Sequence, residues 1–210
     1  MPTRLWLISH ASTAAQRSAT FAGNDEPLDA RGLAEVNAHA QRERIRFESV
    51  RNLHALTSPA ACARDTARAL GLTATVAAEL ADTCYGEWQR LRIADVATQA
   101  PLALEAWLRD PAAAPPGGES FEMVLSRVGI WLDKLALSTS VNPTDSTVRT
   151  VVAITHAAVL RAALIHVLRA SATSFTQIEI APLTTIELRH HARHSWKWWP
   201  GAPLEAAPTI

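Results

Sequence analysis

The chain has 210 residues, of which 48% are hydrophobic, and its 20 Lys and Arg residues balance 20 Asp and Glu residues. This length and apolar content predict one domain, residues 1–210, with a sizeable core. The balanced charge argues against nucleic acid or an anionic membrane as a partner, because no net field attracts a polyanion. No apolar run approaches the roughly 18 residues that cross a bilayer, so we expect no membrane-spanning helix.

The N-terminal residues and the cysteine content favour a cytoplasmic protein. The N-terminal segment lacks the charged-then-apolar profile of a signal peptide. The two cysteines, Cys62 and Cys84, are too few for a disulfide framework. We therefore expect a cytoplasmic protein with free thiols, and the sequence leaves open whether it forms a homodimer.

The first predicted element is a strand that ends in a polar cluster. Leu5–Ile8 is a continuous apolar run, typical of a strand buried on both faces, and it stops at the small and polar residues Ser9–Thr13. The carboxyl ends of parallel strands form the edge at which open α/β sheets bind ligands. His10 is therefore expected on a rigid element at the mouth of a crevice.

Two further strands and two helices are predicted before residue 77. Asp29 suits the N-cap of a helix with apolar residues on one face. Residues 52–58 form the next apolar strand, and Pro59 predicts the start of a helix that ends at Gly71. Residues 73–76 can form a short strand.

The middle of the chain reads as helices around one loop. Residues 90–109 predict one or two helices, and the Pro- and Gly-rich residues 110–118 predict a loop. Ser120 stands at the start of an amphipathic helix. Towards the C-terminus, strands are predicted at 177–180, 183–189 and 195–199. The histidines in this part are interpreted as exposed hairpin residues: His190, His191 and His194.

A second strand that ends in histidine lies far downstream of the first. Val151–Ile154 repeats the buried apolar run, and Thr155, His156 and Ala157 repeat the small and polar exit. The following residues read as a helix, so His156 lies at a strand-to-helix turn whose free backbone N–H groups attract anions. Two strand-end histidines in one domain are best explained if they face each other across a bound anion.

Strand, polar turn and helix therefore follow one another three times with the same polarity. This pattern predicts an α/β fold with a largely parallel sheet.

Six segments of the chain resemble the motifs of the histidine phosphatase superfamily, branch 1, the phosphoglycerate-mutase-like branch that includes ribazole phosphatases. LISHAST is similar to L-x-R-H-G-x-T, PLDARG to P-L-T-x-x-G, and SPAACARDTARALG to S-P-L-x-R-A-x-x-T-A-x-x-L-G. LADTCYGEW is similar to L-x-E-x-x-x-G-x-W, GGESFEMVLSRV to the G-E-S helix, and ITHAAVLRAAL to V-S-H-G-G-V-I-R-A-L. The resemblance covers nearly the whole chain. It implies a three-layer α/β/α sandwich with a mostly parallel central sheet and a small inserted cap at about residues 82–120.

The resemblance also implies roles for individual residues. In the family, the first histidine attacks phosphorus and becomes a phosphohistidine, so His10 would be the nucleophile and His156 the second pocket histidine. Asp82 would be the acid that protonates the leaving oxygen, in place of the usual Glu. The phosphate-binding residues are then expected at Ser9, Thr13, Arg17, Cys62, Thr155 and Ala157. No cofactor or metal is implied.

The sequence departs from the family pattern at both pocket arginines. Ser9 stands where an arginine precedes the nucleophile, and Cys62 stands at the arginine of S-P-L-x-R. One well-placed arginine can be worth about 10³–10⁵ in the rate of phosphoryl transfer. The loss of two guanidinium forks therefore predicts weak binding and slow cleavage of a phosphate monoester.

Arg17 is the best candidate for a replacement cation, because it follows His10 by seven residues. Arg161 and the basic segment 189–194 are the next candidates. The alternative interpretation of Arg17 is a solvated loop charge.

Three functional hypotheses remain open at this stage. The first is a phosphohydrolase that cleaves a small phosphoester through His10 and Asp82. The second is an inactive pseudo-phosphatase whose crevice binds a small anion, another small ligand or a partner. The third is a metal site, because His10, Cys62, Asp82 and His156 would converge if the family geometry holds, although their spacing is not a metal-ligand signature.

Overall fold

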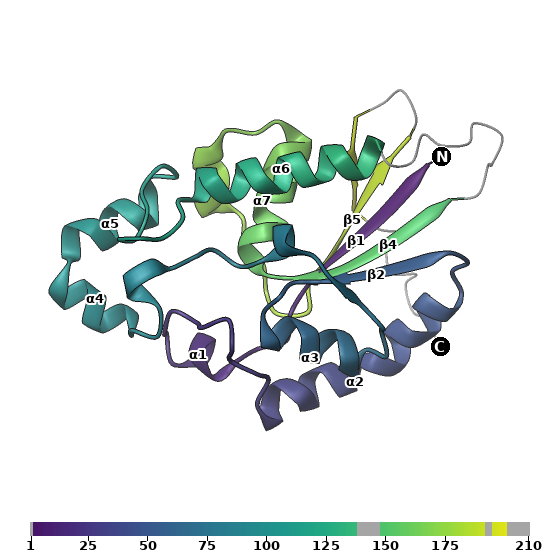
Figure 1. Cartoon of the computed structure of the whole chain (residues 1–210), viewed down its shortest axis with the longest axis horizontal. Helices are drawn as coiled ribbons and strands as arrows, with labels where there is room; N and C mark the ends of the chain where they lie inside the picture. The colour runs from purple at the N-terminus through teal and green to yellow at the C-terminus, as the bar shows by residue number, and fades with distance from the viewer. Residues whose placement is uncertain (1, 138–147, 192–194, 201–210) are drawn as a thin grey trace, which may run out of the picture.

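A six-stranded sheet forms the centre of the molecule in a computed structural model that describes residues 2–137, 148–191 and 195–200 (Figure 1). The strand order is β3-β2-β4-β1-β5-β6. The strands are β1 (Thr3–Ser9), β2 (Leu53–Thr57), β3 (Thr75–Val76), β4 (Arg149–Thr155), β5 (Thr185–His190) and β6 (Lys197–Trp199). Strands β1 to β4 pair in parallel, whereas β5 runs antiparallel to β1 and β6. The predicted α/β fold with a mostly parallel sheet is confirmed.

Helices cover both faces of the sheet, with α2 and α3 on one side and α6 and α7 on the other (Figure 1). The helices are α1 (Ala14–Arg17), α2 (Ala30–Glu48), α3 (Ala61–Ala69), α4 (Ile93–Gln99), α5 (Pro101–Arg109), α6 (Phe121–Leu137) and α7 (Ala157–Leu168). Short 3-10 helices lie at Ala78–Leu80, Gly86–Trp88 and Ala172–Gln177. Within the described ranges, every helix is too short or too polar to pass through a bilayer.

The two central strands explain why the sheet is covered on both faces. Successive side chains of a strand point to opposite faces. In β1, Leu5 and Leu7 pack with α6 and α7, whereas Trp6 and Ile8 pack with α2 and α3. Strand β4 alternates in the same way, and Val151–Ile154 are fully buried. A continuous apolar run is therefore needed, because both sets of side chains leave water.

The register of the parallel strands places the ends of β1, β2 and β4 at one edge. Ser9 at the end of β1 lies opposite Thr155 at the end of β4, and Thr57 at the end of β2 lies opposite Ile154. The residues that follow these strands therefore emerge side by side. This edge is where the polar exits predicted from the sequence meet.

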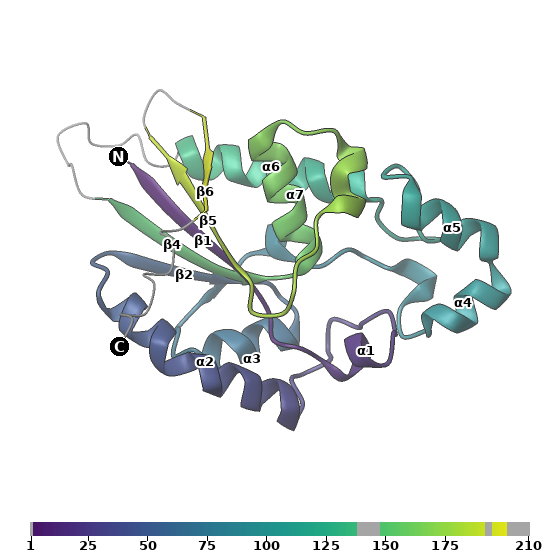
Figure 2. The same ribbon diagram turned by 180° about the vertical axis from the view of Figure 1, so that it is seen from behind.

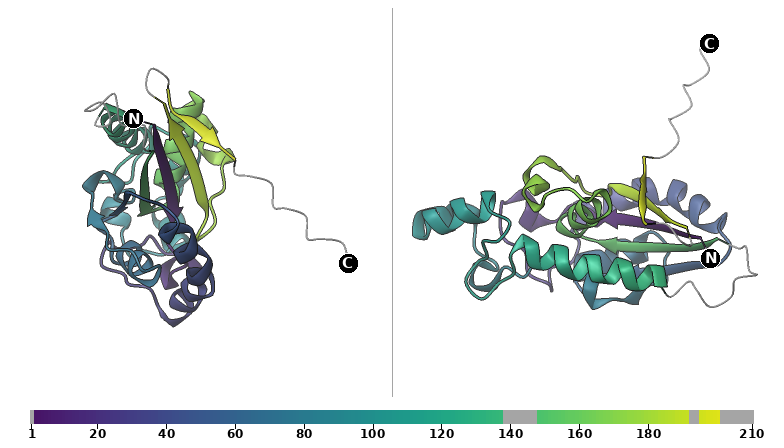
Figure 3. Two further views of the ribbon diagram at one scale, coloured as in Figure 1. Left: turned by 90° about the vertical axis from the view of Figure 1, so that its right-hand side faces the viewer. Right: turned by 90° about the horizontal axis from the view of Figure 1, so that it is seen from above.

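The segment between β3 and α6 forms a lobe beside the sandwich, because α4 and α5 lie outside the helix layers (Figures 1 and 3). A small apolar cluster joins this lobe to the loop after β1, and its buried members are Phe21, Trp88, Val96 and Leu104. Gly86 has a φ of +52°, and a Cβ there would lie 2.1 Å from Pro116 O. Backbone segments approach so closely at this point that only glycine fits.

Two details of the chain differ from the sequence-based expectations. The predicted strand at 177–180 is wrong, because Ala172–Gln177 forms a short 3-10 helix capped by Ser171. Ile178 and Ile180 are apolar because they pack against the core, although they pair with no strand. Helix α3 begins at Ala61 rather than Pro59. The predicted hairpin is present in the described residues as β5 and β6, at the edge of the sheet (Figure 2).

We expect the Leu160→Ala substitution to destabilise the protein by about 2–5 kcal/mol, because it leaves a cavity in the core between α7 and the sheet. Leu160 is fully buried, whereas Leu102 on α5 is 80% exposed. The matched control Leu102→Ala should change the free energy of unfolding by less than about 0.5 kcal/mol. Urea unfolding followed by circular dichroism measures both, and equal effects would contradict the assigned core.

Candidate active site

His10 is held at the end of β1 by its backbone and by one ring nitrogen. Its backbone N–H donates to Thr155 O at 2.8 Å, and its Nδ1 lies 2.7 Å from Ala11 O. A carbonyl can only accept, so Nδ1 carries the proton in this bond and Nε2 carries the lone pair. The next residue is tied to α3, because Ala11 N donates to Thr66 Oγ1 at 3.2 Å. The ring therefore has a defined orientation with a free nucleophilic nitrogen.

His156 faces His10 from the end of β4, at the N-cap of α7. The two ring centroids are 4.9 Å apart in an edge-to-face arrangement. His156 Nε2 lies 2.8 Å from Ser58 Oγ, which follows β2. The exits of three neighbouring parallel strands thus build one site. The facing pair of histidines predicted from the two strand ends is present in the structure.

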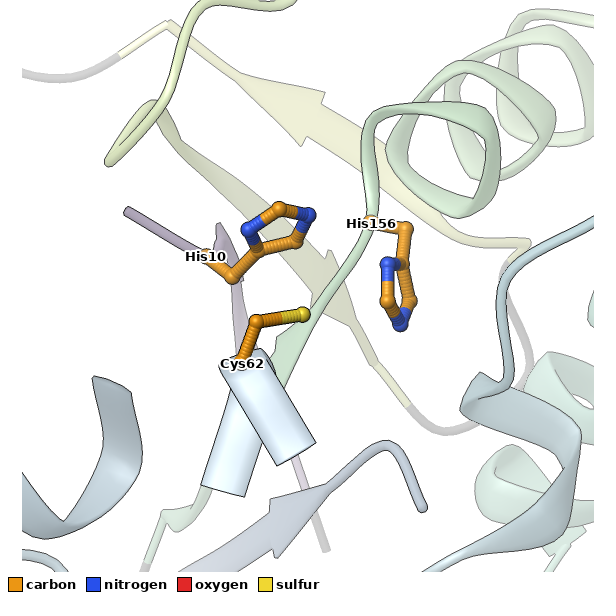
Figure 4. A group of neighbouring side chains, drawn as sticks. All are labelled: His10, Cys62 and His156. Carbon is orange, nitrogen blue, oxygen red and sulfur yellow. The ribbon is translucent and has the colours of Figure 1, made fainter. Parts of the chain in front are cut away.

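Cys62 completes this group from the first turn of α3. Its side chain points to the space between the two imidazoles (Figure 4). One ligating atom from each of His10, Cys62 and His156 lies within 4.8 Å of those of the other two, and all three residues are buried. Burial raises the pKa of the Cys62 thiol to about 12, and the Asp82 carboxylate adds to the rise. The thiol is therefore protonated at neutral pH.

Asp82 lies next to His156 on the loop that leads from the sheet to the cap. Its Oδ2 is 3.4 Å from His156 Nδ1, but the two atoms form no hydrogen bond in the described structure. Burial lowers the pKa of His156 from 6.5 to about 4, although the Asp82 charge acts in the opposite direction. At neutral pH the imidazole is uncharged, so this contact is not an ion pair.

Arg127 on α6 fixes the loop that carries Asp82. Its Nη1 donates to Glu79 O at 2.8 Å, and its Nη2 donates to Ala81 O and Asp82 O at 2.9 Å each. Glu119 pairs with the same guanidinium at 3.0 Å. Arg127 therefore positions the carboxylate by binding the backbone around it.

The site opens into a cavity of about 460 Å³ between the sheet edge and the cap lobe. Aromatic side chains form much of its wall: Phe21, Tyr85, Trp107, Phe121 and Phe175. The first residues of α7, Ala157 and Ala158, also line it. Unpaired N–H groups at a helix N-terminus attract an anion. The cavity thus combines a polar end at the histidines with an apolar wall.

The charged side chains on the described wall of the cavity, apart from the histidines, are Glu26, Asp82 and Arg161. Arg161 Nε donates to Ile178 O at 2.8 Å, and its two Nη groups make no hydrogen bond to described residues. Burial lowers the pKa of Arg161, and Tyr85 and Asp82 oppose this effect. A guanidinium stays charged at neutral pH. Apart from the histidines, one cation and two carboxyl groups on the described wall therefore determine the electrostatic field in the cavity.

A sequence model of the histidine phosphatase superfamily (branch 1) matches residues 5–199. The chain belongs to this superfamily.

One protein similar to this chain is much longer than the chain. A "bifunctional protein" of Mycobacterium tuberculosis is 36% identical over 141 residues, which are 64% of this chain and 37% of that protein. The chain thus spans little more than a third of that relative. An adenosylcobalamin/alpha-ribazole phosphatase of Escherichia coli is 29% identical over 140 residues, 63% of this chain and 66% of that protein.

A similar solved structure is that of a mycobacterial glucosyl-3-phosphoglycerate phosphatase in complex with VO3. It has a TM-score of 0.77 and 26% identity, over 93% of this chain and 96% of that one. The fold of this chain is therefore that of phosphoglycerate-mutase-like phosphatases.

Most of the site residues predicted from the sequence lie together. Six of them line the cavity: His10, Thr13, Cys62, Asp82, His156 and Ala157. They come from four separate parts of the chain, and the strand register brings them together.

Two predicted phosphate-binding residues do not reach the cavity wall. Ser9 Oγ donates to Ala181 O at 2.7 Å and accepts from Thr184 N at 3.0 Å, so it holds the loop before β5. Thr155 is fully buried, and its Oγ1 donates to Leu80 O at 2.6 Å. Both hydroxyls are used to fix the backbone around the site.

Arg17 is likewise not placed to replace the missing cations. Its guanidinium pairs with Asp29 at the start of α2, and its Nη1 donates to Ser12 Oγ at 3.0 Å. It is absent from the described cavity wall. The expectation that Arg17 binds phosphate is therefore corrected, because the N-terminus of α2 supplies a carboxylate that holds it.

The sequence reasoning assigned no role to Ser58, Arg127 or Tyr85. Ser58 lies in a polar strand exit like those of the two histidines, so the same pattern could have identified it. Arg127 and Tyr85 carry no such signal, because Arg127 binds the backbone of the Asp82 loop and Tyr85 packs against Phe21 and Trp107, and these partners lie on other elements of the chain.

We expect the free energy of unfolding of the protein, kept free of metal ions by a chelator, to fall as the pH drops from about 6.5 to about 4. In this range the unfolded chain protonates His156, whereas the folded chain does not, so stability decreases by up to roughly 3 kcal/mol. The His156→Gln variant should show a flatter pH profile. Urea titrations at several pH values measure this, and identical slopes for both proteins would disprove the assignment.

Proposed function

We propose that the protein is a phosphohydrolase that transfers the phosphoryl group of a small phosphoester to His10 and then to water. The observation that carries this proposal is the pair of imidazoles 4.9 Å apart beside the N-terminus of α7. The free Nε2 of His10 suits a nucleophile, because its other nitrogen is held by Ala11 O. Membership of the family and the phosphatase names of the relatives support the same activity.

The proposed reaction has two steps. His10 is the nucleophile in the first and the leaving group in the second, and Asp82 is the acid in the first and the base in the second. In the first step, His10 Nε2 forms a bond to phosphorus while the bond from phosphorus to the leaving oxygen breaks, and the Asp82 carboxyl gives its proton to that oxygen. In the second step, a water oxygen attacks phosphorus, the N–P bond breaks, and the Asp82 carboxylate takes the water proton. His10 and Asp82 return to their starting states, and inorganic phosphate leaves.

The groups that would hold the phosphoryl oxygens in this proposal are few. They are the N–H groups at the start of α7, the neutral His156 in the tautomer with its proton on Nδ1, the hydroxyl of Thr13 and the guanidinium of Arg161. Ser9 and Cys62 stand where the family motifs have arginines, and Glu26, joined by Asp82 once it has given up its proton, adds negative charge. We therefore expect turnover well below that of a pocket with both guanidinium groups.

The cavity favours a phosphoester with an apolar leaving group. Phe21, Tyr85 and Trp107 form a wall in which ring centroids lie 5.1–6.2 Å apart. Aromatic surfaces bury apolar area and stack on flat groups. A flat or hydrocarbon leaving group would replace part of the binding energy that the missing arginines do not supply.

A second candidate function is binding without turnover. The observation that favours it is that the side chains at both arginine positions are small and uncharged, and that Ser9 is turned to the loop before β5. In that case the cavity would hold a small, partly apolar ligand or anion.

A cytoplasmic setting is proposed for either function, because Cys62 and Cys84 are free thiols.

We expect the wild-type protein to hydrolyse an aryl phosphate, and the His10→Ala variant to lose at least about 1,000-fold in rate or fall to the buffer rate. The substitution removes the atom that accepts the phosphoryl group. The control His39→Ala, on the exposed face of α2, should keep the activity. Steady-state assays measure the rates, and equal activity in wild type and His10→Ala would sink the phosphohistidine mechanism.

We expect Cys62→Arg to raise aryl phosphate turnover, with a ceiling of about 10³–10⁵-fold, because the new guanidinium would enter the cavity beside His10. Cys62→Lys is the matched control and should give a smaller gain, since an ammonium is a point charge without a planar fork. Circular dichroism checks that both variants fold. No gain in either folded variant would favour the binding function.

A further inference from the structure

The buried group of His10, Cys62 and His156 brings three good metal donors together. Their ligating atoms lie within 4.8 Å of one another, although the residues come from the β1 exit, the start of α3 and the β4 exit. Figure 4 shows the Cys62 sulfur directed between the two rings. Imidazole nitrogen and thiolate sulfur are the preferred ligands of zinc. The three side chains are 6% exposed or less, so their geometry is set by packing.

The hydrogen bonds of His10 leave the correct nitrogen available to a metal ion. Its Nδ1–H donates to Ala11 O at 2.7 Å, so Nε2 presents its lone pair. Metal-bound histidines usually donate their second N–H to a carbonyl, carboxylate or water, which fixes the ring and its tautomer. His10 already has such an outer contact.

His156 supplies the second, independent observation. Its Nε2 is bonded to Ser58 Oγ at 2.8 Å, whereas its Nδ1 is a buried atom with no hydrogen-bond partner in the described structure. A buried, unpaired ring nitrogen costs free energy unless something satisfies it. Asp82 Oδ2 lies 3.4 Å from this nitrogen without a hydrogen bond. When the neutral ring carries its proton on Nε2, where Ser58 Oγ can accept the hydrogen bond, Nδ1 presents its lone pair, and a cation between Nδ1 and Oδ2 would be attracted to both.

We propose that His10 Nε2, Cys62 Sγ and His156 Nδ1 bind one divalent ion of the zinc type. The fourth coordination position faces the cavity beside Asp82, which either binds the ion or accepts a hydrogen bond from a metal-bound water. This site requires no turnover, so it stands independently of the proposed phosphohydrolase activity.

The distances are compatible with this assignment. In a tetrahedral zinc site with Zn–N of about 2.0–2.1 Å and Zn–S of about 2.3 Å, neighbouring ligand atoms lie about 3.3–3.6 Å apart. The 3.4 Å between His156 Nδ1 and Asp82 Oδ2 already has this value. One ligating atom from each of the three side chains lies within 4.8 Å of those of the other two, so shifts of about 1 Å or slightly more would bring such atoms to this spacing. Side-chain rotation provides such shifts without moving the backbone.

The replacement of arginine by cysteine in the family pattern changes the charge of the position as well as its shape. A guanidinium at residue 62 would repel a metal ion from the two imidazoles, whereas a thiol can become a ligand by losing its proton. An ion held there also takes the lone pair of His10. The metal-bound protein would therefore be unable to form a phosphohistidine, so metal binding and phosphoryl transfer exclude each other.

The test is a metal titration of the full chain after treatment with a chelator. We expect one Zn²⁺ per chain with a dissociation constant below about 1 μM. With Co²⁺ as the probe, we expect the intense visible bands of a tetrahedral site and a near-ultraviolet sulfur-to-cobalt charge-transfer band. An octahedral Co²⁺ spectrum, or a stoichiometry well below one, would overturn the proposal.

The variants separate this site from other thiols and histidines. Cys62→Ser should remove the charge-transfer band and weaken Zn²⁺ binding by more than about 100-fold, and His10→Ala should weaken it as strongly. Ser58→Ala should weaken it by roughly 10–100-fold, because it removes the outer contact of His156. The matched control is Cys84→Ser, at an exposed cysteine on the same cavity wall, which should bind like wild type.

Circular dichroism shows whether each variant folds. If Cys62→Ser does not fold, His10→Ala provides the test of the site. Equal Zn²⁺ affinity in wild type and in these variants would refute the site. Where aryl phosphate is hydrolysed, Zn²⁺ should inhibit wild type, and a chelator should restore the rate. A protein that binds Zn²⁺ but hydrolyses nothing even after the chelator has removed the metal would refute the phosphohydrolase proposal alone. Hydrolysis without Zn²⁺ binding would refute the metal site alone.

Discussion

The parallel pairing of β1 with β4 is the constraint on which the site depends. Its register sets Ser9 opposite Thr155, and the hydrogen bond from His10 N to Thr155 O continues the ladder by one residue. A shift of one residue would turn every buried side chain of β1 to the other face, so the apolar core on both sides fixes this register. The same packing that stabilises the sheet therefore holds His10 and His156 face to face.

The backbone around His10 and His156 is held in place by side chains that do not line the cavity. Ser9 and Thr155 bind neighbouring carbonyls, and Arg127 binds three carbonyls of the loop that leads to Asp82. These contacts leave the two imidazoles, the thiol and the carboxylate as the groups that can react. A cavity with an aromatic wall lies directly above them.

The electrostatics of the pocket connect the two proposals. A phosphate dianion needs positive charge around its oxygens, and Arg161 is the guanidinium that the described cavity wall supplies. A divalent cation needs neutral or negative donors, and those are what the exits of β1 and β4 and the start of α3 present. His10 serves both, since a single lone pair either attacks phosphorus or binds a metal ion. Which of the two occupies the pocket is decided by charge rather than by the fold.

The sequence alone determined the fold class and the two histidines, because buried apolar runs and polar strand exits are local patterns that the sheet turns directly into geometry. The motifs likewise located Cys62 and Asp82. Only the tertiary structure decided the rest. Arg17 is held by Asp29, Ile178 and Ile180 pack without strand pairing, and the outer contact of His156 is Ser58. These outcomes depend on which distant side chains meet, and sequence spacing does not encode the competition between partners that become neighbours only when the chain folds.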